Sequence, residues 1–282
     1  MGIALLSSMA VAGWTVITVA GSDTLVLLGQ RWAEEYNKKN REVLIQVTGG
    51  GSVAGIQALM NGTADICEAS RDLNDSELKL AREKGISPYQ VPVALDGVAI
   101  YLNTENPVRE LSFEQLRGIY TGKVTNWSEV GGKDAQIVTY GRESTSGTFY
   151  FFREHVLNGS SYSTGVQRLP GTGAVVNAVD KDIDGIGYGG LSWASGVKYA
   201  AVKLSDSVVA VVPDKKSITD GSYPISRELY WFFNGEPKAK IREFVEWALS
   251  DVGQELAEKL GYVALPENRR GIWPDSTSQS SP

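Results

Sequence analysis

Residues 15–69 read TVITVAGSDTLVLLGQRWAEEYNKKNREVLIQVTGGGSVAGIQALMNGTADICEA and carry the strongest fold signal in the chain. Short apolar runs predict three strands, at Thr15–Ala20, Val43–Val47 and Ala64–Ala69. Between them, apolar residues at helical spacing predict two helices, over Thr24–Asn37 and Ser52–Asn61. Strands that alternate with helices form a parallel sheet with helices on its faces. The sequence therefore predicts an α/β fold.

The alternation continues along the rest of the chain. An apolar stretch at Tyr89–Asn103, interrupted by Pro92 and by Asp96-Gly97, is suited to bridging two lobes. The sequence Ser112-Phe-Glu-Gln115 matches a capping box and predicts the start of a helix. Further strands are predicted at Ile137–Tyr140, Gly185–Gly189, Val208–Val212 and Leu229–Phe233. Further helices are predicted near Ser146 or Thr148 and over Pro237–Leu249 and Asp251–Leu260.

Length and composition narrow the function classes. A chain of 282 residues has room for one large or two ordinary domains. It carries 27 Lys and Arg against 33 Asp and Glu, a net charge of −6, which argues against a nucleic-acid binder with a general basic field. The single Cys67 excludes an internal disulfide and a cysteine zinc cluster, and the single His155 removes most histidine-dependent catalysis. The 31 glycines exceed the average share and need an explanation.

Both ends of the chain differ from the middle. Residues 1–14 contain the apolar, small-residue-rich stretch Ile3–Ala12, which ends in an A-x-A pattern typical of export signals but has no basic residue before it. We interpret it as a residual signal-like segment, with a buried N-terminal strand as the alternative. Residues 271–282 are rich in Ser and Pro and predict a disordered tail.

Three turns share one design, in which a strand ends, a Gly/Ser/Thr-rich turn follows and a helix begins. They are Gly21–Thr24, Gly49–Ser52 and Ser144–Thr148. A helix N-terminus exposes unpaired N–H groups that hold anions, hydroxyls add donors, and glycine lets the backbone approach. Each turn alone is equally typical of a plain N-cap. Together, and with Arg142 six residues before Thr148, they predict an oxyanion site.

Motifs for other chemistry are weaker. Gly185–Gly190 fits G-x-G-x-x-G but lacks the strand before it and the helix after it that a nucleotide site needs. The Gly-Lys pair at residues 122–123 has the wrong P-loop spacing, and no G-x-S-x-G elbow or metal-spaced cluster occurs. The alternating Asp180, Asp182 and Asp184 lack the glutamate that closes a calcium loop. His155 is expected to pack or lie at the surface. These observations favour binding over catalysis.

Several stretches resemble one family in the same order from Thr15 to Arg270, the phosphate-binding receptors of ABC phosphate transporters. The most specific are LSFEQLRGIYTGKVTNW at residues 111–127 and RESTSGT at residues 142–148, with TGGGSVAGIQALMNGTADICEASRDL at residues 48–73. The resemblance implies a periplasmic-binding-protein type II fold, in which two α/β lobes are joined by two crossing strands around a ligand cleft. It implies a discontinuous first lobe of residues 15–95 and 226–270 and a second lobe of residues 96–225, with crossings near Pro92–Val98 and Tyr223–Arg227.

The same resemblance implies a set of phosphate-binding residues: Asp23, Thr24, Leu25, Ser52, Ser70, Arg71, Arg142, Ser146, Gly147 and Thr148. Arg142 would be the charge anchor. Many family members have an aspartate where Arg71 stands, and that carboxylate accepts the proton of hydrogen phosphate and so rejects sulfate. In this chain either Asp72 or Asp23 takes that role, or Arg71 adds a second cation and weakens the discrimination.

The function implied is high-affinity binding of inorganic phosphate outside the cytoplasmic membrane and its delivery to the permease subunits of an ABC importer. We expect no catalysis, cofactor, metal or nucleic acid, and a monomer located in the periplasm or at the cell surface, free or tethered. A receptor for sulfate, arsenate or molybdate is the first alternative. A phosphate-ester hydrolase with Ser52 or Ser146 as nucleophile is the second.

Overall fold

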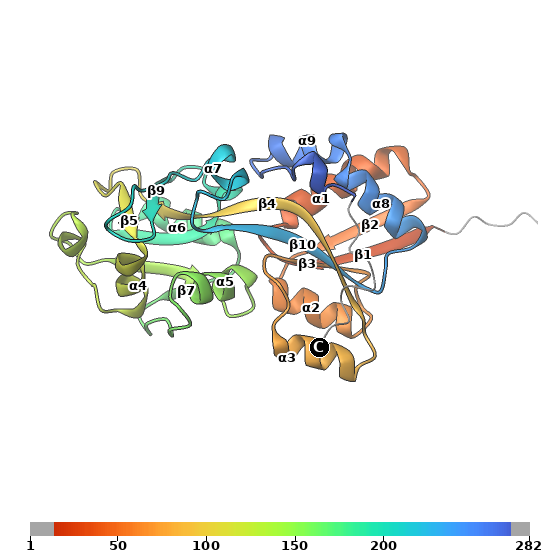
Figure 1. The fold of residues 1–282 in the computed structure, drawn as a ribbon, viewed down its shortest axis with the longest axis horizontal. Helices are drawn as coiled ribbons and strands as arrows, with labels where there is room; N and C mark the ends of the chain where they lie inside the picture. The colour runs from red at the N-terminus through yellow and green to blue at the C-terminus, as the bar shows by residue number, and fades with distance from the viewer. Residues whose placement is uncertain (1–13, 272–282) are drawn as a thin grey trace, which may run out of the picture.

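The protein consists of two α/β lobes that lie side by side and are joined by two long strands (Figure 1). This computed structural model describes residues 14–271. Within that range every helix is too short or too polar to cross a bilayer. Apart from Trp14 and Gly271, the signal-like segment 1–14 and the tail 271–282 predicted from sequence lie outside the described residues. The predicted α/β class is confirmed.

The first lobe begins with the predicted alternation of strands and helices. Parallel strands run in the order β2-β1-β3, and the elements are β1 (Thr15–Gly21), α1 (Val26–Lys39), β2 (Val43–Thr48), α2 (Ser52–Met60), β3 (Ile66–Ala69) and α3 (Asp75–Glu83). Helix α3 was not predicted, although Asn74 and Glu77 form a capping box at its start. The parallel arrangement brings the carboxyl ends of β1 and β2 to one edge.

Two strands carry the chain between the lobes. Strand β4 (Pro88–Leu102) pairs with β10 (Ser226–Asn234) up to Gly97, and from Val98 onward it pairs with strands of the second lobe. Strand β10 in turn pairs with β3 of the first lobe. The change of partners at Gly97 and Val98 coincides with the Asp96-Gly97 interruption of the apolar stretch. The predicted bridging role of this stretch is confirmed.

The second lobe continues the sheet in the order β4-β8-β6-β7, with β9 beside β4 and β5 beside β9. Its elements are β5 (Glu110–Ser112), α4 (Phe113–Thr121), η1 (Trp127–Val130), β6 (Val138–Arg142), α5 (Gly147–His155), β7 (Gln167–Leu169), α6 (Thr172–Lys181), β8 (Gly185–Gly190), η2 (Leu191–Trp193), β9 (Lys198–Lys203) and α7 (Lys215–Thr219). The predicted capping box at Ser112 and Gln115 is present. In the core of the second lobe, Phe152 stacks on Tyr188 with ring centroids 4.1 Å apart.

The C-terminal segment returns to the first lobe. Helices α8 (Ala239–Leu249) and α9 (Asp251–Lys259) lie with α1 on one side of its sheet, while α2 and α3 lie on the other (Figure 1), and the short turn η3 (Glu267–Arg269) follows. Trp32 of α1 donates a 2.8 Å hydrogen bond to the Gly253 carbonyl and packs edge-on against Trp231 at 5.2 Å. Chain segments far apart in sequence thus share one core.

One expectation about secondary structure is wrong, and helix α6 was not predicted. Val208–Val212 is no strand but a loop with one bridge, between Val211 and Val202, and Val209 is 87% exposed. High strand propensity alone does not form a strand where no partner edge is available. Helix α6 was missed because its first residues follow Gly171 in a segment that resembles a turn.

A carboxyl group is buried in the core of the first lobe. Glu68 on β3 is fully buried, and its Oε1 accepts a 3.2 Å hydrogen bond from Trp231 Nε1. Its Oε2 has no partner among the described residues. A Cβ added at Gly29 would meet Glu68 Oε1 at 2.3 Å, so glycine makes room for this carboxyl. Burial raises the pKa of Glu68 to about 8, so the group is held in its protonated form at neutral pH.

Glu68→Gln is expected to gain stability relative to the wild type as the pH rises. Folding raises the pKa of this acid. The contribution of Glu68 to the free energy of unfolding is therefore fully present below the ordinary pKa of 4.5 and is lost as the pH rises through about 8. An amide is neutral throughout, so the difference in the free energy of unfolding should grow by up to ~1.4 kcal/mol per pH unit in that window. Urea unfolding near pH 5 and near pH 8.5 measures it. The exposed Glu114→Gln controls for the substitution, and parallel profiles for wild type and Glu68→Gln would contradict the interpretation.

Candidate anion-binding site

The three predicted turns meet where the lobes touch. The turn Gly21–Thr24 follows β1, Gly49–Ser52 follows β2, and Ser144–Thr148 follows β6 of the other lobe. Across the boundary Val53 N donates to the Thr145 carbonyl at 3.0 Å. A Cβ added at Gly51, whose φ is +92°, would meet the same carbonyl oxygen at 2.4 Å. Glycine is therefore required at this point for the two lobes to approach each other.

Hydroxyl groups from both lobes gather at this contact. Thr24 Oγ1 and Thr148 Oγ1 are 3.1 Å apart, and Ser52 Oγ lies 3.3 Å from Ser70 Oγ and accepts a 3.1 Å bond from Ser70 N. All four residues are at most 1% exposed. A Cβ at Gly147, the first residue of α5, would meet Ser52 Oγ at 2.3 Å and Ser70 Oγ at 2.6 Å. The start of α5 thus faces hydroxyls of the first lobe.

Arg142 supplies a positive charge to the same region. Its side chain is 2% exposed, Nη2 donates to Asp23 Oδ2 at 2.6 Å across the lobe boundary, and Nη1 donates to Thr172 Oγ1 at 2.7 Å. Its Nε has no partner among the described residues. Burial lowers the pKa of Arg142 from its ordinary value, while Asp23 acts in the opposite direction. Such a buried guanidinium with a free donor is suited to an oxyanion.

The side chains of two residues predicted to bind phosphate serve the turns themselves. Leu25 has its side chain in the core, fully buried, and its N–H donates to the Ser22 carbonyl at 3.0 Å. Ser146 is the N-cap of α5, where its Oγ accepts from Phe149 N at 3.3 Å. Both residues shape the turns, and their side chains are occupied by packing or capping.

The structure separates the two carboxylates left open as proton acceptors. Asp23 lies beside Arg142, with Oδ1 accepting from Gly50 N at 3.0 Å. Asp72 accepts from Gln90 Nε2 at 2.6 Å and lies against Tyr230, whose pKa is raised by burial and by this carboxylate. Of the two carboxylates, Asp23 is the one that lies beside the buried guanidinium of Arg142.

The terminal nitrogens of Arg71 are paired within its own lobe. Its Nη1 and Nη2 donate to the Glu77 carboxylate at 2.7 and 2.8 Å, and Nη1 also donates to the Asp72 carbonyl. With Tyr150 and Arg227 it lines a cavity of about 670 Å³ between the lobes. Its Nε is the donor without a partner among the described residues.

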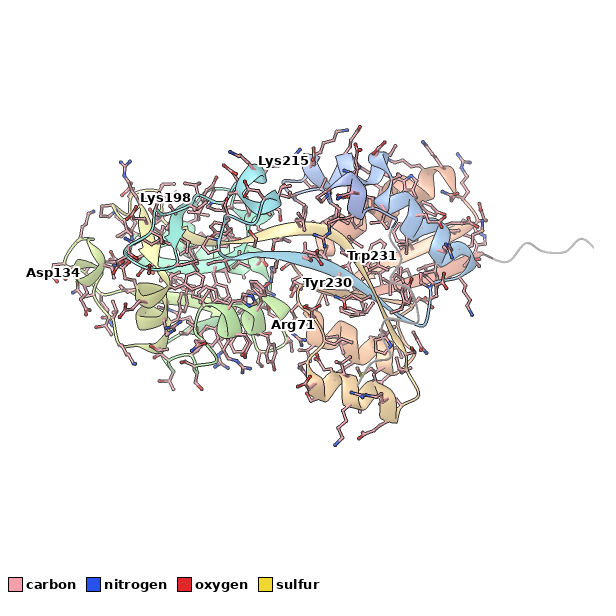
Figure 2. The ribbon with its side chains drawn as sticks, in the orientation of Figure 1. Arg71, Asp134, Lys198, Lys215, Tyr230 and Trp231 are labelled. Atoms are coloured by element: carbon pink, nitrogen blue, oxygen red, sulfur yellow. The ribbon has the colours of Figure 1, made fainter. Side chains whose placement is uncertain are left out.

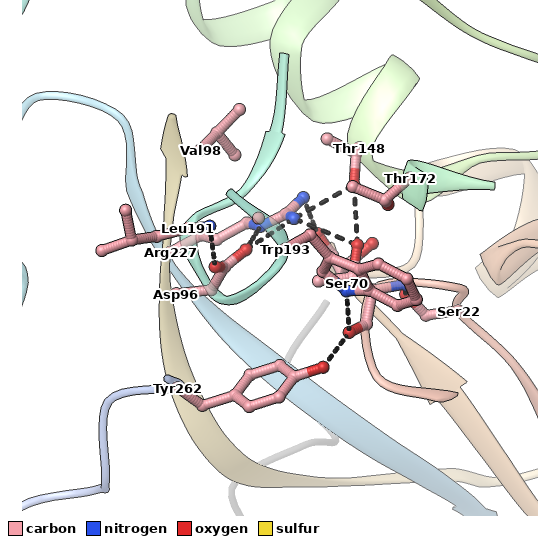
Figure 3. A network of polar contacts seen from close by, with 12 residues as sticks. Ser22, Ser70, Asp96, Val98, Thr148, Thr172, Leu191, Trp193, Arg227 and Tyr262 are labelled. Carbon is pink, nitrogen blue, oxygen red and sulfur yellow. Dashed lines mark hydrogen bonds and ion pairs between the residues drawn. The ribbon is translucent and has the colours of Figure 1, made fainter. Parts of the chain in front are cut away.

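A buried ion pair at the hinge was not predicted from the sequence. Arg227 of β10 donates to Asp96 Oδ2 through Nε at 3.0 Å and Nη2 at 2.7 Å, and Nη2 also reaches Thr148 Oγ1 at 3.0 Å and Thr24 Oγ1 at 3.4 Å (Figure 3). Its Nη1 donates to the Ser70 carbonyl at 3.0 Å. A charged aspartate buried in an apolar strand needs a partner cation. Asp96 within its apolar stretch was therefore the sequence feature that could have indicated this pair.

The remaining motifs have structural roles. Gly185–Gly190 is strand β8 itself, not a turn before a helix. His155 stacks on Phe151 at 4.2 Å, and Cys67 is a buried free thiol whose pKa is raised by burial. Asp182 accepts from Tyr140 Oη at 2.8 Å and from Asp184 N. Between residues 14 and 271, no group of acidic, His or Cys side chains is placed to hold a metal ion.

Two lobes that enclose a polar site at a two-strand hinge define a binding protein of the periplasmic-binding-protein class, and a model of the PBP superfamily domain matches residues 10–252. The chain is 33% identical to the phosphate-binding protein PstS of Pseudomonas aeruginosa over 268 residues, covering 89% of this chain and 83% of that protein. It is 34% identical to PstS of Staphylococcus saprophyticus, covering 93% and 82%. The chain belongs to the PstS family of phosphate-binding proteins.

Solved structures agree with this family. A phosphate ABC transporter substrate-binding protein from Clostridium perfringens, with bound phosphate, is 31% identical and superposes with a TM-score of 0.80, covering 89% of this chain and all (100%) of that one. An ABC-type phosphate transport receptor from Vibrio cholerae is 29% identical with a TM-score of 0.72, at the same coverage. The predicted type II fold is confirmed.

Proposed function

We propose that this protein captures inorganic phosphate between its lobes outside the cytoplasmic membrane and delivers it to an ABC phosphate importer. The observation that carries the proposal is the buried Arg142, whose Nη2 pairs with Asp23 across the lobe boundary and whose Nε has no partner among the described residues. The PstS relatives and the phosphate-bound structure from Clostridium perfringens support the choice of anion. Closure of the lobes around the ligand is a general mechanism of such receptors.

The proposed binding residues have distinct roles. Arg142 provides charge, the side chains of Thr24, Ser52, Ser70 and Thr148 provide hydroxyls, and the α5 N-terminus at Gly147 provides backbone N–H groups. Asp23 positions Arg142 and accepts the proton of hydrogen phosphate, and Leu25 and Ser146 hold the turns. Arg227 joins the set, since its Nη2 contacts the hydroxyls of both threonines.

Selectivity tests this assignment. Phosphate is expected to bind about 100-fold more tightly than sulfate near neutral pH, because sulfate has no proton for Asp23 and leaves the carboxylate facing an unpaired anion oxygen. Arsenate, which keeps a proton, should compete well, and molybdate should resemble sulfate. Competition calorimetry measures these affinities. Asp23→Asn should reduce the preference for phosphate over sulfate to less than about tenfold, and Asp72→Asn is its matched control. Equal affinities of wild type for phosphate and sulfate would refute the role of Asp23.

Binding is favoured over hydrolysis of phosphate esters. Ser146 Oγ is occupied as a helix cap and Ser52 Oγ lies against Ser70, so neither is paired with a base. His155 packs on Phe151 instead. Incubation with a chromogenic phosphate ester should give no turnover, and turnover lost on replacing Ser52 would establish the enzyme. We further propose that the protein acts as a monomer that docks on the permease subunits from the periplasm or the cell surface.

A further inference from the structure

Arg71 is paired within its own lobe and lies near the boundary with the other lobe (Figure 2), where it lines the cavity between them. Its guanidinium is paired with both oxygens of Glu77, and the residue is 9% exposed. Glu77 is fixed in turn, because its Oε2 accepts from Asn74 N at 2.9 Å in the capping box that starts α3. A guanidinium held by a capped helix loses little further freedom when it makes a contact.

The contact that it makes is with the opposite lobe. Arg71 Cζ lies 4.9 Å from the ring centroid of Tyr150, which is on α5 three residues after Gly147. Arg153 lies over the same ring at 5.1 Å, but it belongs to the same helix as Tyr150. A guanidinium over an aromatic face is attracted to it, and more strongly where water is partly excluded. The Arg71 contact depends on closure, and the Arg153 contact does not.

We infer that Arg71 is a positioning residue that stabilises the closed form by stacking on Tyr150 and thereby sets how long a bound anion is retained. The inference rests on the proposed function, since it concerns closure on phosphate. Association takes place through the open form, in which the contact is absent, so the association rate is insensitive to it. Dissociation requires reopening, which breaks the contact, so the dissociation rate depends on it directly.

A double-mutant cycle tests this inference. Arg71→Gln, Tyr150→Leu and the double variant are compared with wild type for phosphate affinity by calorimetry and for dissociation rate by stopped-flow tryptophan fluorescence. Each single variant should release phosphate about five- to tenfold faster, and the double variant no faster than either single one. Arg153→Gln removes a guanidinium from the same ring within one lobe and should stay within about twofold of wild type.

Different results would overturn this inference and the proposed function. Loss of affinity by more than about 100-fold in Arg71→Gln with no effect of Tyr150→Leu would place Arg71 on the anion itself. Additive effects, or no effect, would remove the coupling between the two residues. A wild-type protein that binds no phosphate would reject the proposed function instead. In that case the closure contact is tested without ligand by X-ray scattering. Both single variants and the double variant should then have a radius of gyration larger than that of wild type by the same amount, and an unchanged radius would reject the closure contact.

Discussion

Arg142→Met is expected to weaken phosphate binding by about 100- to 1000-fold. The substitution removes a charged donor from the proposed anion site, and truncating one partner of a buried hydrogen-bonded charge pair in a complex costs about 2–5 kcal/mol of binding free energy. Methionine fills much of the same volume as arginine. Asp23, which loses its partner, still accepts the bond from Gly50 N, and its side chain is 20% exposed to water. The ligand-free protein should therefore unfold close to the wild-type temperature. Calorimetry with phosphate and thermal unfolding without it measure the two effects.

Two companion variants sharpen this test. Arg142→Lys keeps the charge but loses the planar fork that joins Asp23 and Thr172, so its affinity should fall between those of wild type and Arg142→Met. Arg168→Met alters an exposed arginine of the same lobe, which lies 5.4 Å from the Phe149 ring, and should bind phosphate like wild type. Near-native affinity in Arg142→Met would show that the anion is held elsewhere.

Gly147→Ala is expected to reduce phosphate affinity by about 100-fold while leaving each lobe folded. The added methyl group would lie 2.3 Å from Ser52 Oγ and 2.6 Å from Ser70 Oγ, so the lobes cannot close without displacing both hydroxyls. Gly147 lies at the start of a helix, where alanine is a good helix former, so the open form should be as stable as wild type. Titration calorimetry and thermal unfolding again separate binding from folding.

The control for Gly147→Ala is an alanine at a glycine without a close neighbour. Gly165 is exposed in the second lobe, and a Cβ there would meet only Ser163 Oγ at 3.7 Å. Gly165→Ala should therefore bind phosphate normally. If Gly147→Ala binds as tightly as wild type, the contact between α5 and the two serines does not form in the liganded state. If Gly147→Ala binds phosphate weakly and also unfolds at a lower temperature than wild type, steric strain is present in the open form as well.

The turns were predictable because their signals are local. A strand, a Gly/Ser/Thr-rich turn and a helix start are encoded within about ten residues, so Thr24, Ser52 and Ser146–Thr148 were identified from sequence as candidate anion-binding positions. The arrangement of Asp96 and Arg227 was not predictable in this way. These residues are 131 apart in sequence and become a pair only because β4 and β10 run side by side through the hinge.

The contacts of Arg71 with Glu77 and Tyr150 are not described by the resemblance. Its position beside Ser70 implied a place among the phosphate ligands, and nothing in the neighbouring sequence indicated Tyr150. The residues that occupy its guanidinium are Glu77, which a capping box holds in place, and a ring from the other lobe. Which of several charged groups faces an anion depends on side-chain partners that come from separate segments of the chain.

By itself the sequence determined the α/β class, the strand–helix order, the PstS family resemblance and the local chemistry of the anion turns, because periodicity, caps and turn residues act over short distances. The tertiary structure alone decided which groups of the two lobes meet: Arg142 with Asp23, Arg227 with Asp96 and Arg71 with Tyr150. These contacts join residues brought together by the crossing of two strands, and their energies depend on burial and on distances of a few ångströms. Such quantities exist only once the chain has folded.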